Sequence, residues 1–165
     1  MLYLQNEPPS QSHETRRALS AADGYLFLDL PEEALTELES IDLNDRNDAP
    51  VLLARTRVLL HMRRWREAER LALRGAAEHP DQEEFTVQRA FALQQLKRGE
   101  QARNVLLAAP EWIRRSGILH YNLACYEAQL GDLNAARHCI GIAISMNAAM
   151  RKNAKADPDL EALWN

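Results

Sequence analysis

Cysteine, glycine and aromatic residues are all scarce in this sequence, and each shortage argues against a class of protein. The 165 residues include two cysteines and six glycines, and aromatic residues make up 6% of the chain. Two cysteines are too few for a disulfide framework, and no stretch contains the ~18 apolar residues that a membrane-spanning helix needs. The N-terminal residues lack the basic start and apolar stretch of a secretory signal peptide. These absences favour a soluble protein of the reducing cytoplasm.

Catalytic and metal-binding motifs are missing as well. The sequence contains no HExxH, no CxxC and no glycine-rich phosphate loop. His120 and Cys125 are five residues apart on one predicted helix, a poor spacing for shared ligation, while Cys139 falls on another helix. No pair of carboxylates stands in an apolar setting suited to general acid–base work. We therefore predict a protein that is not an enzyme and that has no catalytic residues, cofactor, metal or small-molecule substrate.

Helix-forming residues dominate what is present. Runs of Leu, Ala, Arg, Glu and Gln recur along the chain, and all of these residues favour helices. The alternation of β-branched residues that marks strands is missing. Apolar residues make up 46% of the chain, enough to exclude disorder by composition and to fill the core of one domain. The sequence predicts an all-α protein.

A period of 34 residues runs through the chain. In each of four predicted helix–turn–helix units an alanine stands at the same place in the second helix. These are Ala34, Ala68, Ala102 and Ala136. Two helices of a hairpin approach closely only where their side chains are small, which explains alanine at such a crossing. A fixed period of this size indicates a repeat solenoid, and the usual function of such proteins is to bind partners.

The first helices of these units carry matching residues. A small residue recurs at Ala22, Thr56, Ala90 and Ala124, and a bulky residue follows it at Tyr25, Leu59 and Leu93. The fourth bulky position holds Glu127, with Tyr126 beside it. This pattern resembles the tetratricopeptide repeat (TPR) family over about residues 15–148. The resemblance implies a right-handed superhelical solenoid of about four repeats, at 15–48, 49–82, 83–116 and 117–148.

Both ends of the chain lie outside this pattern. Residues 1–14 are expected to form a flexible arm. Residues 149–165 are expected to close the array as a capping segment, since a terminal repeat exposes an apolar face. Asp157 and Pro158 predict the start of a capping helix, as its N-cap and first residue.

In a TPR superhelix the first helix of each repeat lines the concave face, and the resemblance points to a row of residues there. The row is largely apolar, with Asp23 and Arg57 as its charges, and suits an extended or helical peptide with apolar anchors. Its members, here named the concave row, are Leu19, Asp23, Leu53, Arg57, Leu60, Val87, Phe91, Gln94, Tyr121 and Cys125. Arg57 is its only base, which argues against a carboxylate-clamp co-chaperone. The alternative is that these apolar positions simply belong to the core.

Charge is unevenly spread along the chain, whose net charge is −4. Residues 29–48 carry eight acids and one base, whereas residues 55–74 carry seven arginines and two acids. The negative total gives no signature of nucleic-acid binding. The arginines predict a basic ridge that meets an acidic tail, an acidic protein surface or an anionic membrane. The alternative is a solvated surface with ion pairs between repeats. The ridge consists of Arg63, Arg64, Arg66, Arg70 and Arg74.

Three functions fit these features. The first is a non-enzymatic adaptor or scaffold that binds a protein segment through the concave row and the basic ridge. A narrower version follows from a general resemblance to bacterial kinesin light chain-like TPR proteins. It implies an accessory of a tubulin-like filament, or its link to an anionic membrane. The alternative is a TPR-type chaperone for a secreted or assembling client protein.

Overall fold

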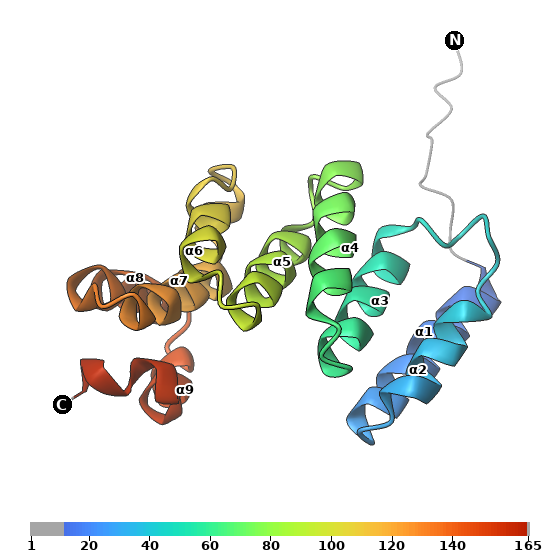
Figure 1. Ribbon diagram of the computed structural model, residues 1–165, viewed down its shortest axis with the longest axis horizontal. Coiled ribbons are helices and arrows are strands. Elements are labelled where there is room, and N and C mark those ends of the chain that lie inside the picture. Colours follow the sequence, from blue (N-terminus) through green and yellow to red (C-terminus); the bar gives the residue numbers. More distant parts are fainter. Residues whose placement is uncertain (1–11, 165) are drawn as a thin grey trace, which may run out of the picture. The chain divides into compact units, whose positions relative to one another are not determined.

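The structure is a computed structural model that describes residues 12–164, and helices joined by short connections make up nearly all of that span (Figure 1). Strands are absent from residues 12–164. The chain divides into two compact units, Met1–Arg63 and Arg64–Asn165. Most of the predicted N-terminal arm, residues 1–11, lies outside the described part of the chain.

The first unit contains the helices α1 (His13–Phe27), α2 (Pro31–Glu39) and α3 (Ala49–His61). α1 begins after Ser12, whose hydroxyl accepts a hydrogen bond from the backbone N–H of Thr15 at 3.1 Å. Proline occupies the first turn of both α2 and α3, where a missing N–H costs nothing. The three helices enclose a core of small and aliphatic side chains. It includes Ala18, Ala22, Ala34, Leu38, Ile41, Val51, Ala54 and Val58.

The second unit begins with α4 (Trp65–Glu78), α5 (Glu83–Gln95) and α6 (Gly99–Leu107). α4 packs against α5, and α5 packs against α6. α6 ends at Leu107, shortly before Pro110, and the connection that follows contains one 3-10 turn, η1 (Ile113–Arg115). Ile113 in this turn is buried in the core of the second unit, whereas its neighbours in the connection are exposed.

The unit ends with α7 (Gly117–Gln129) and α8 (Leu133–Met146), which pack together as a hairpin, followed by α9 (Met150–Ala156) and the 3-10 helix η2 (Pro158–Leu163). The capping helix predicted from Asp157 onward is therefore a 3-10 helix, and a separate α-helix precedes it. Asp157 does cap η2, because its side chain accepts from the N–H of Asp159 at 3.0 Å. Leu160 and Leu163 are buried in the core of this unit.

The small residues at the 34-residue period lie where the resemblance implies. Ala34, Ala68, Ala102 and Ala136 are each 0% exposed. The matching positions in the first helices are 1% exposed at Ala22 and 0% exposed at Thr56, Ala90 and Ala124. Thr56 remains compatible with burial because its hydroxyl donates to the carbonyl of Leu52 at 2.8 Å. The division into four repeats remains a prediction.

The same period reappears in the backbone. The second residue after the end of each first helix has a positive φ: 58° at Asp29, 56° at Arg63, 63° at Lys97 and 90° at Gly131. These residues end their helices in the left-handed conformation, in which the following backbone N–H groups bond back to the last turn. At one such end the N–H of Arg98 donates to the carbonyl of Leu93 at 3.0 Å. The turn between α3 and α4 comprises residues 62–64, because α4 begins at Trp65.

Candidate interaction surfaces

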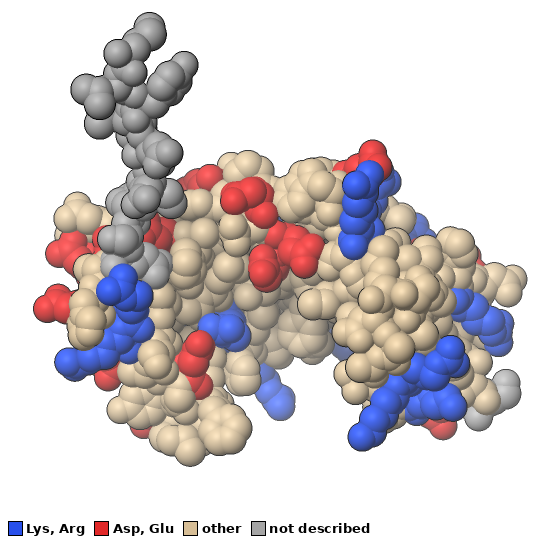
Figure 2. Space-filling model, turned by 180° about the vertical axis from the view of Figure 1, so that it is seen from behind, with Lys and Arg blue, Asp and Glu red and all other residues tan. Residues whose placement is uncertain are grey.

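Charged side chains mark the surface of the protein in small groups. On the face drawn in Figure 2, basic and acidic side chains lie next to one another in several places, with wide uncharged areas between these groups. The concave row and the basic ridge were both predicted on such surfaces. Their members divide between the two units, so each part is described within its own unit.

In the first unit, the two charges of the concave row bind each other. Arg57 Nη2 on α3 lies 2.6 Å from Asp23 Oδ1 on α1, and the two side chains are 47% and 58% exposed. The two residues are 34 positions apart, so the ion pair joins equivalent places in successive predicted repeats. Leu19, Leu53 and Leu60 are partly buried. This part of the row therefore presents a neutral, partly apolar strip with one exposed ion pair.

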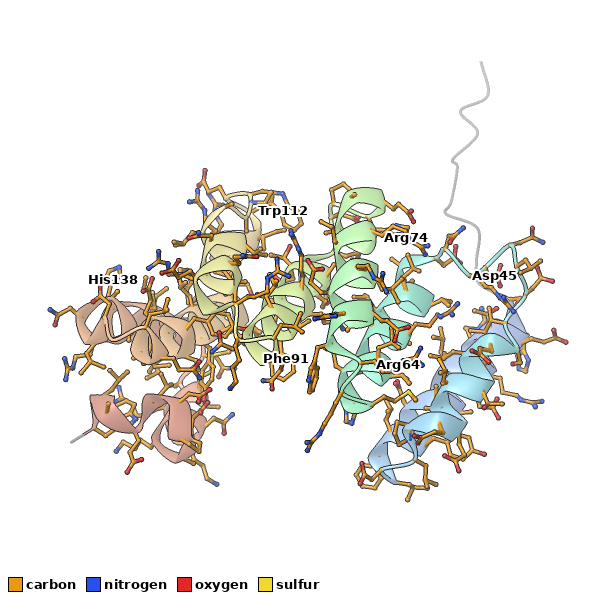
Figure 3. All side chains as sticks on the ribbon, in the orientation of Figure 1. Asp45, Arg64, Arg74, Phe91, Trp112 and His138 are labelled. Carbon is orange, nitrogen blue, oxygen red and sulfur yellow. The ribbon has the colours of Figure 1, made fainter. Side chains whose placement is uncertain are left out.

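In the second unit, Val87, Phe91 and Gln94 lie along α5. Phe91 is 38% exposed, and its ring meets that of Trp65 edge to face at a centroid distance of 6.2 Å (Figure 3). Gln94 has a buried Oε1 that accepts no hydrogen bond within residues 12–164. The exposed ring of Phe91 suits a partner that supplies an apolar anchor, whereas the buried Gln94 acceptor lies out of a partner's reach.

The row continues onto α7, where the chain's own C-terminal segment covers it. The hydroxyl of Tyr121 donates to Asp157 Oδ2 at 2.8 Å, and Cys125 is 6% exposed. Burial and the carboxylate of Asp157 raise the pKa of the Cys125 thiol well above its usual range. Tyr121 and Cys125 were predicted to line the groove, but the structure places Cys125 beneath η2 rather than at a surface.

The five arginines of the basic ridge differ in their partners. Arg64 binds both carboxylate oxygens of Glu67, at 2.7 and 2.6 Å, and this bond lowers the pKa of the Glu67 carboxyl. Arg74, at the other end of α4, lies 3.5 Å from Glu78 (Figure 3). Arg63 is exposed in the turn that ends α3. Two arginines of the ridge therefore have acidic partners one turn away.

Arg66 and Arg70 face a hollow instead. Its volume is about 570 Å³, and its lining residues, here named the arginine groove, are Arg66, Glu69, Arg70, Leu96 and Arg98. Arg98 was left out of the predicted ridge. The 34-residue period is the signal that finds it, because Arg98 stands one period after Arg64.

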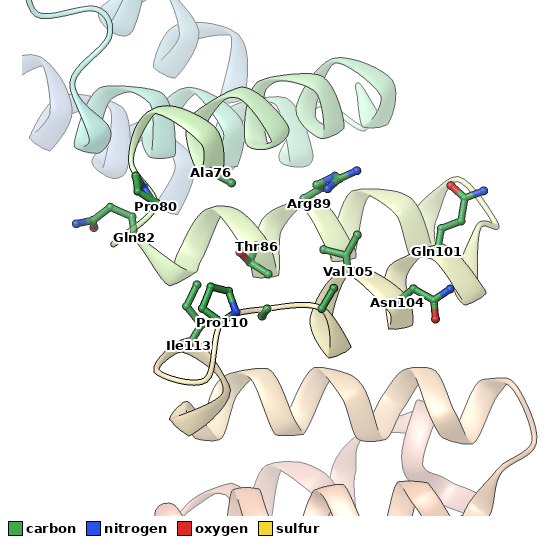
Figure 4. Close-up of a pocket in the computed structure, with 12 residues that line it drawn as sticks. Ala76, Pro80, Gln82, Thr86, Arg89, Gln101, Asn104, Val105, Pro110 and Ile113 are labelled. Atoms are coloured by element: carbon green, nitrogen blue, oxygen red, sulfur yellow. The ribbon is translucent and has the colours of Figure 1, made fainter.

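A second hollow, of about 520 Å³, lies between α4, α5 and α6 (Figure 4). Val105, Pro110 and Ile113 supply its apolar side, and Thr86 and Arg89 face them from α5. Thr86 and Arg89 lie on a different face of α5 from Val87, Phe91 and Gln94, since residues on one face recur every three or four positions. This hollow is therefore separate from the concave row, and no sequence pattern pointed to it.

One group of possible metal ligands lies at the C-terminal closure. Donor atoms of Cys125, Asp157 and Asp159 are all within 4.8 Å of one another. The Cys125 sulfur lies 3.8 Å from Asp157 Oδ2, which already accepts from Tyr121. Because burial favours the neutral thiol, the arrangement suits a thiol hydrogen bond better than a thiolate ligand. We assign no metal here.

Comparison with known proteins bears on the fold. No protein-family model matches the chain, and no curated protein matches it. Solved structures do. MamA (41-end) from Desulfovibrio magneticus RS-1 is similar with a TM-score of 0.68 and 16% identity, over 88% of this chain and 82% of that one. A structure of MamA AMB-1 is similar with a TM-score of 0.67 and 18% identity, over 88% of this chain and 83% of that one. MamA is a TPR-like all-helical protein. This chain has a TPR-like helical solenoid fold.

A second structure of MamA AMB-1 has a TM-score of 0.63 and 16% identity, over 93% of this chain and 88% of that one. At such low identity the similarity extends to the fold and not to particular residues. Within residues 12–164, no helix combines the length and apolar character that crossing a bilayer requires.

Proposed function

We propose that this protein is a non-enzymatic adaptor or scaffold that binds a segment of another protein along its concave row. The observation that carries the proposal is the burial of small residues at a period of 34 residues, which is typical of TPR-like solenoids. Such a fold offers long surfaces and no enclosed reaction site. The similarity to MamA, a TPR-like scaffold protein, supports the same class of function.

Phe91 and Arg57 are the residues we expect to matter most for binding. Phe91 is exposed and already held in place by Trp65, so a partner would gain its contact without first ordering the side chain. Arg57 and Asp23 form an exposed pair that adds little to stability, on the order of 0.5 kcal/mol. Either charge is therefore available to a partner at small cost to the fold.

The test is affinity purification from the native cell with a double variant, Arg57→Ala with Phe91→Ala. The matched control, Leu107→Ala with Arg114→Ala, removes an exposed apolar and an exposed basic side chain elsewhere. We expect the first variant to lose its partners and the control to keep them, with unchanged helical circular dichroism in both. Partner sets that do not differ between the two variants would reject the concave row as the binding site.

The partner's identity is a narrower part of the proposal. An accessory of a tubulin-like filament would co-sediment with such filaments, and a link to membrane would co-sediment with anionic vesicles, both in a salt-dependent way. A chaperone for a secreted or assembling client would instead keep that client soluble in a co-expression assay. We favour the adaptor, because the C-terminal segment covers the row on α7 and leaves its exposed residues on α1, α3 and α5.

A further inference from the structure

The arginine groove gathers positive charge that the protein itself leaves unpaired. Across the described residues, Arg66, Arg70 and Arg98 take part in no ion pair. Arg98 has only a neutral partner, the side-chain oxygen of Gln101. Two ridge arginines outside the groove, Arg64 at the N-cap of α4 and Arg74 within α4, both pair with glutamates. Unpaired charge is therefore concentrated in the groove rather than spread along α4.

The acid within the groove is already occupied. Glu69 lies 3.2 Å from Arg89 on α5, with its side chain 14% exposed, so its charge is largely used inside the unit. Three guanidinium groups thus face a hollow whose single carboxylate has another partner. Arg66 and Arg70 are one helical turn apart, which lets both point to the same side of α4. Arg98 reaches the hollow from the turn between α5 and α6.

We propose that the arginine groove binds an acidic segment of a partner polypeptide, with successive carboxylates held by Arg66, Arg70 and Arg98. Guanidinium groups bind carboxylates through two parallel hydrogen bonds, so three of them can hold several acids of one extended chain. Leu96 supplies an apolar wall for the aliphatic part of an acidic side chain. The proposal rests on the proposed function, and it adds a second contact site and the chemistry of the partner.

A polypeptide fits the groove better than a lipid surface does. The three arginines line a recess of about 570 Å³, which a flexible acidic chain can enter and a flat bilayer cannot. Membrane-binding basic patches also combine with apolar side chains that insert among the lipids. The groove has a single leucine and so lacks such side chains. Charge complementarity therefore favours an acidic protein segment.

The experiment uses the full chain and a fluorescein-labelled octaglutamate peptide, with octaglutamine as the uncharged reference. Fluorescence anisotropy at about 50 mM salt measures affinity, because screening at higher salt would hide a site of this kind. The groove variant is Arg66→Gln, Arg70→Gln and Arg98→Gln. A charge-matched control changes three exposed bases elsewhere in the second unit, Arg114→Gln, Arg151→Gln and Lys152→Gln. Circular dichroism verifies that both variants are folded.

We expect the groove variant to bind octaglutamate at least about tenfold more weakly and the control to bind within about twofold of the parent. Equal weakening in the two variants would overturn the proposal, since only net charge would then matter. So would the absence of binding to the parent. Vesicles with about 30% phosphatidylserine provide the last comparison. If the groove variant lost binding to these vesicles but kept binding to octaglutamate, a membrane would be favoured over a peptide. Loss of partners in the Phe91 variant but not in the groove variant would leave the proposed function standing and reject this inference.

Discussion

Gly75 on α4 lies directly against the ring of Phe85 on α5, and this contact makes a sharp test of the packing between the two helices. A Cβ added at Gly75 would lie 2.5 Å from Phe85 Cδ1 and 2.7 Å from Cζ, with Cε1 closer still. Phe85 is 0% exposed, and its ring also stacks on His79 at a centroid distance of 6.2 Å. A Cβ at position 75 therefore requires the ring or the backbone of the two helices to shift.

Two effects determine how much the substitution Gly75→Ala changes the free energy of unfolding. Overpacking a buried contact costs typically about 1–3 kcal/mol, and a clash with three ring atoms belongs near the upper end. Replacing glycine by alanine in a helix interior returns about 1 kcal/mol. The free energy of unfolding should therefore fall by about 2 kcal/mol. Gly141 on α8 is the matched control, because a Cβ there meets nothing within 4 Å. Gly141→Ala should raise stability by about 0.5–1 kcal/mol.

Urea unfolding followed by tryptophan fluorescence measures this difference. All three tryptophans, Trp65, Trp112 and Trp164, belong to the second unit, so the signal reports on the unit that holds both glycines. A third protein, Gly75→Ala with Phe85→Leu, should lose less stability relative to Phe85→Leu alone, because the smaller side chain frees space. If Gly75→Ala proved as stable as the parent, the packing of α4 on α5 described above would be refuted.

Three further predictions concern the second unit and use the same unfolding assay. Lys97→Gly should raise stability by about 0.5 kcal/mol and Gly131→Ala should lower it by about 1 kcal/mol, because both positions have a positive φ; changes of the opposite sign would refute this. Arg103→Met should cost about 2 kcal/mol by leaving the buried Glu127 without its partner at 3.6 Å, and Glu127→Leu in that background should recover most of the loss. Burial raises the pKa of Cys125 and Cys139. The folded protein therefore holds protons that the unfolded chain releases above about pH 8.5, and stability should fall as the pH rises past that value, less steeply in a variant with both cysteines changed to alanine.

The helical fold was predictable because packing at close crossings leaves a strong trace in the sequence. A buried crossing accepts only small side chains, so Ala34, Ala68, Ala102 and Ala136 show the period directly. The positions of the helix ends were harder to predict from the sequence. Asp29, Arg63 and Lys97 adopt the left-handed conformation without being glycine, and only Gly131 has the residue type that signals it. Backbone bonds to the preceding turn stabilise these ends, and such bonds do not depend on residue type.

The candidate surfaces were only partly predictable, because they depend on which side chains meet. Pairing of Arg64 with Glu67 and of Arg74 with Glu78 follows from spacings of three and four along one helix. Counting arginines along the chain misses this pairing, and it also misses Arg98, which comes from a different turn. The cover over Cys125 depends on where η2 docks, which is a tertiary contact without a local signal.

The pairing of some ridge arginines and not others changes which partner the charged surface is expected to bind. A ridge of five equivalent arginines would attract any anionic surface, and its strength would depend on net charge alone. Pairing of Arg64 and Arg74 within α4 reduces that general attraction and leaves Arg66, Arg70 and Arg98 around one recess. A recess selects by shape as well as by charge, because only a chain thin enough to enter it can bring its carboxylates to all three guanidinium groups. If the arginine groove is the binding site that we propose, the protein should prefer an acidic peptide over a flat anionic surface.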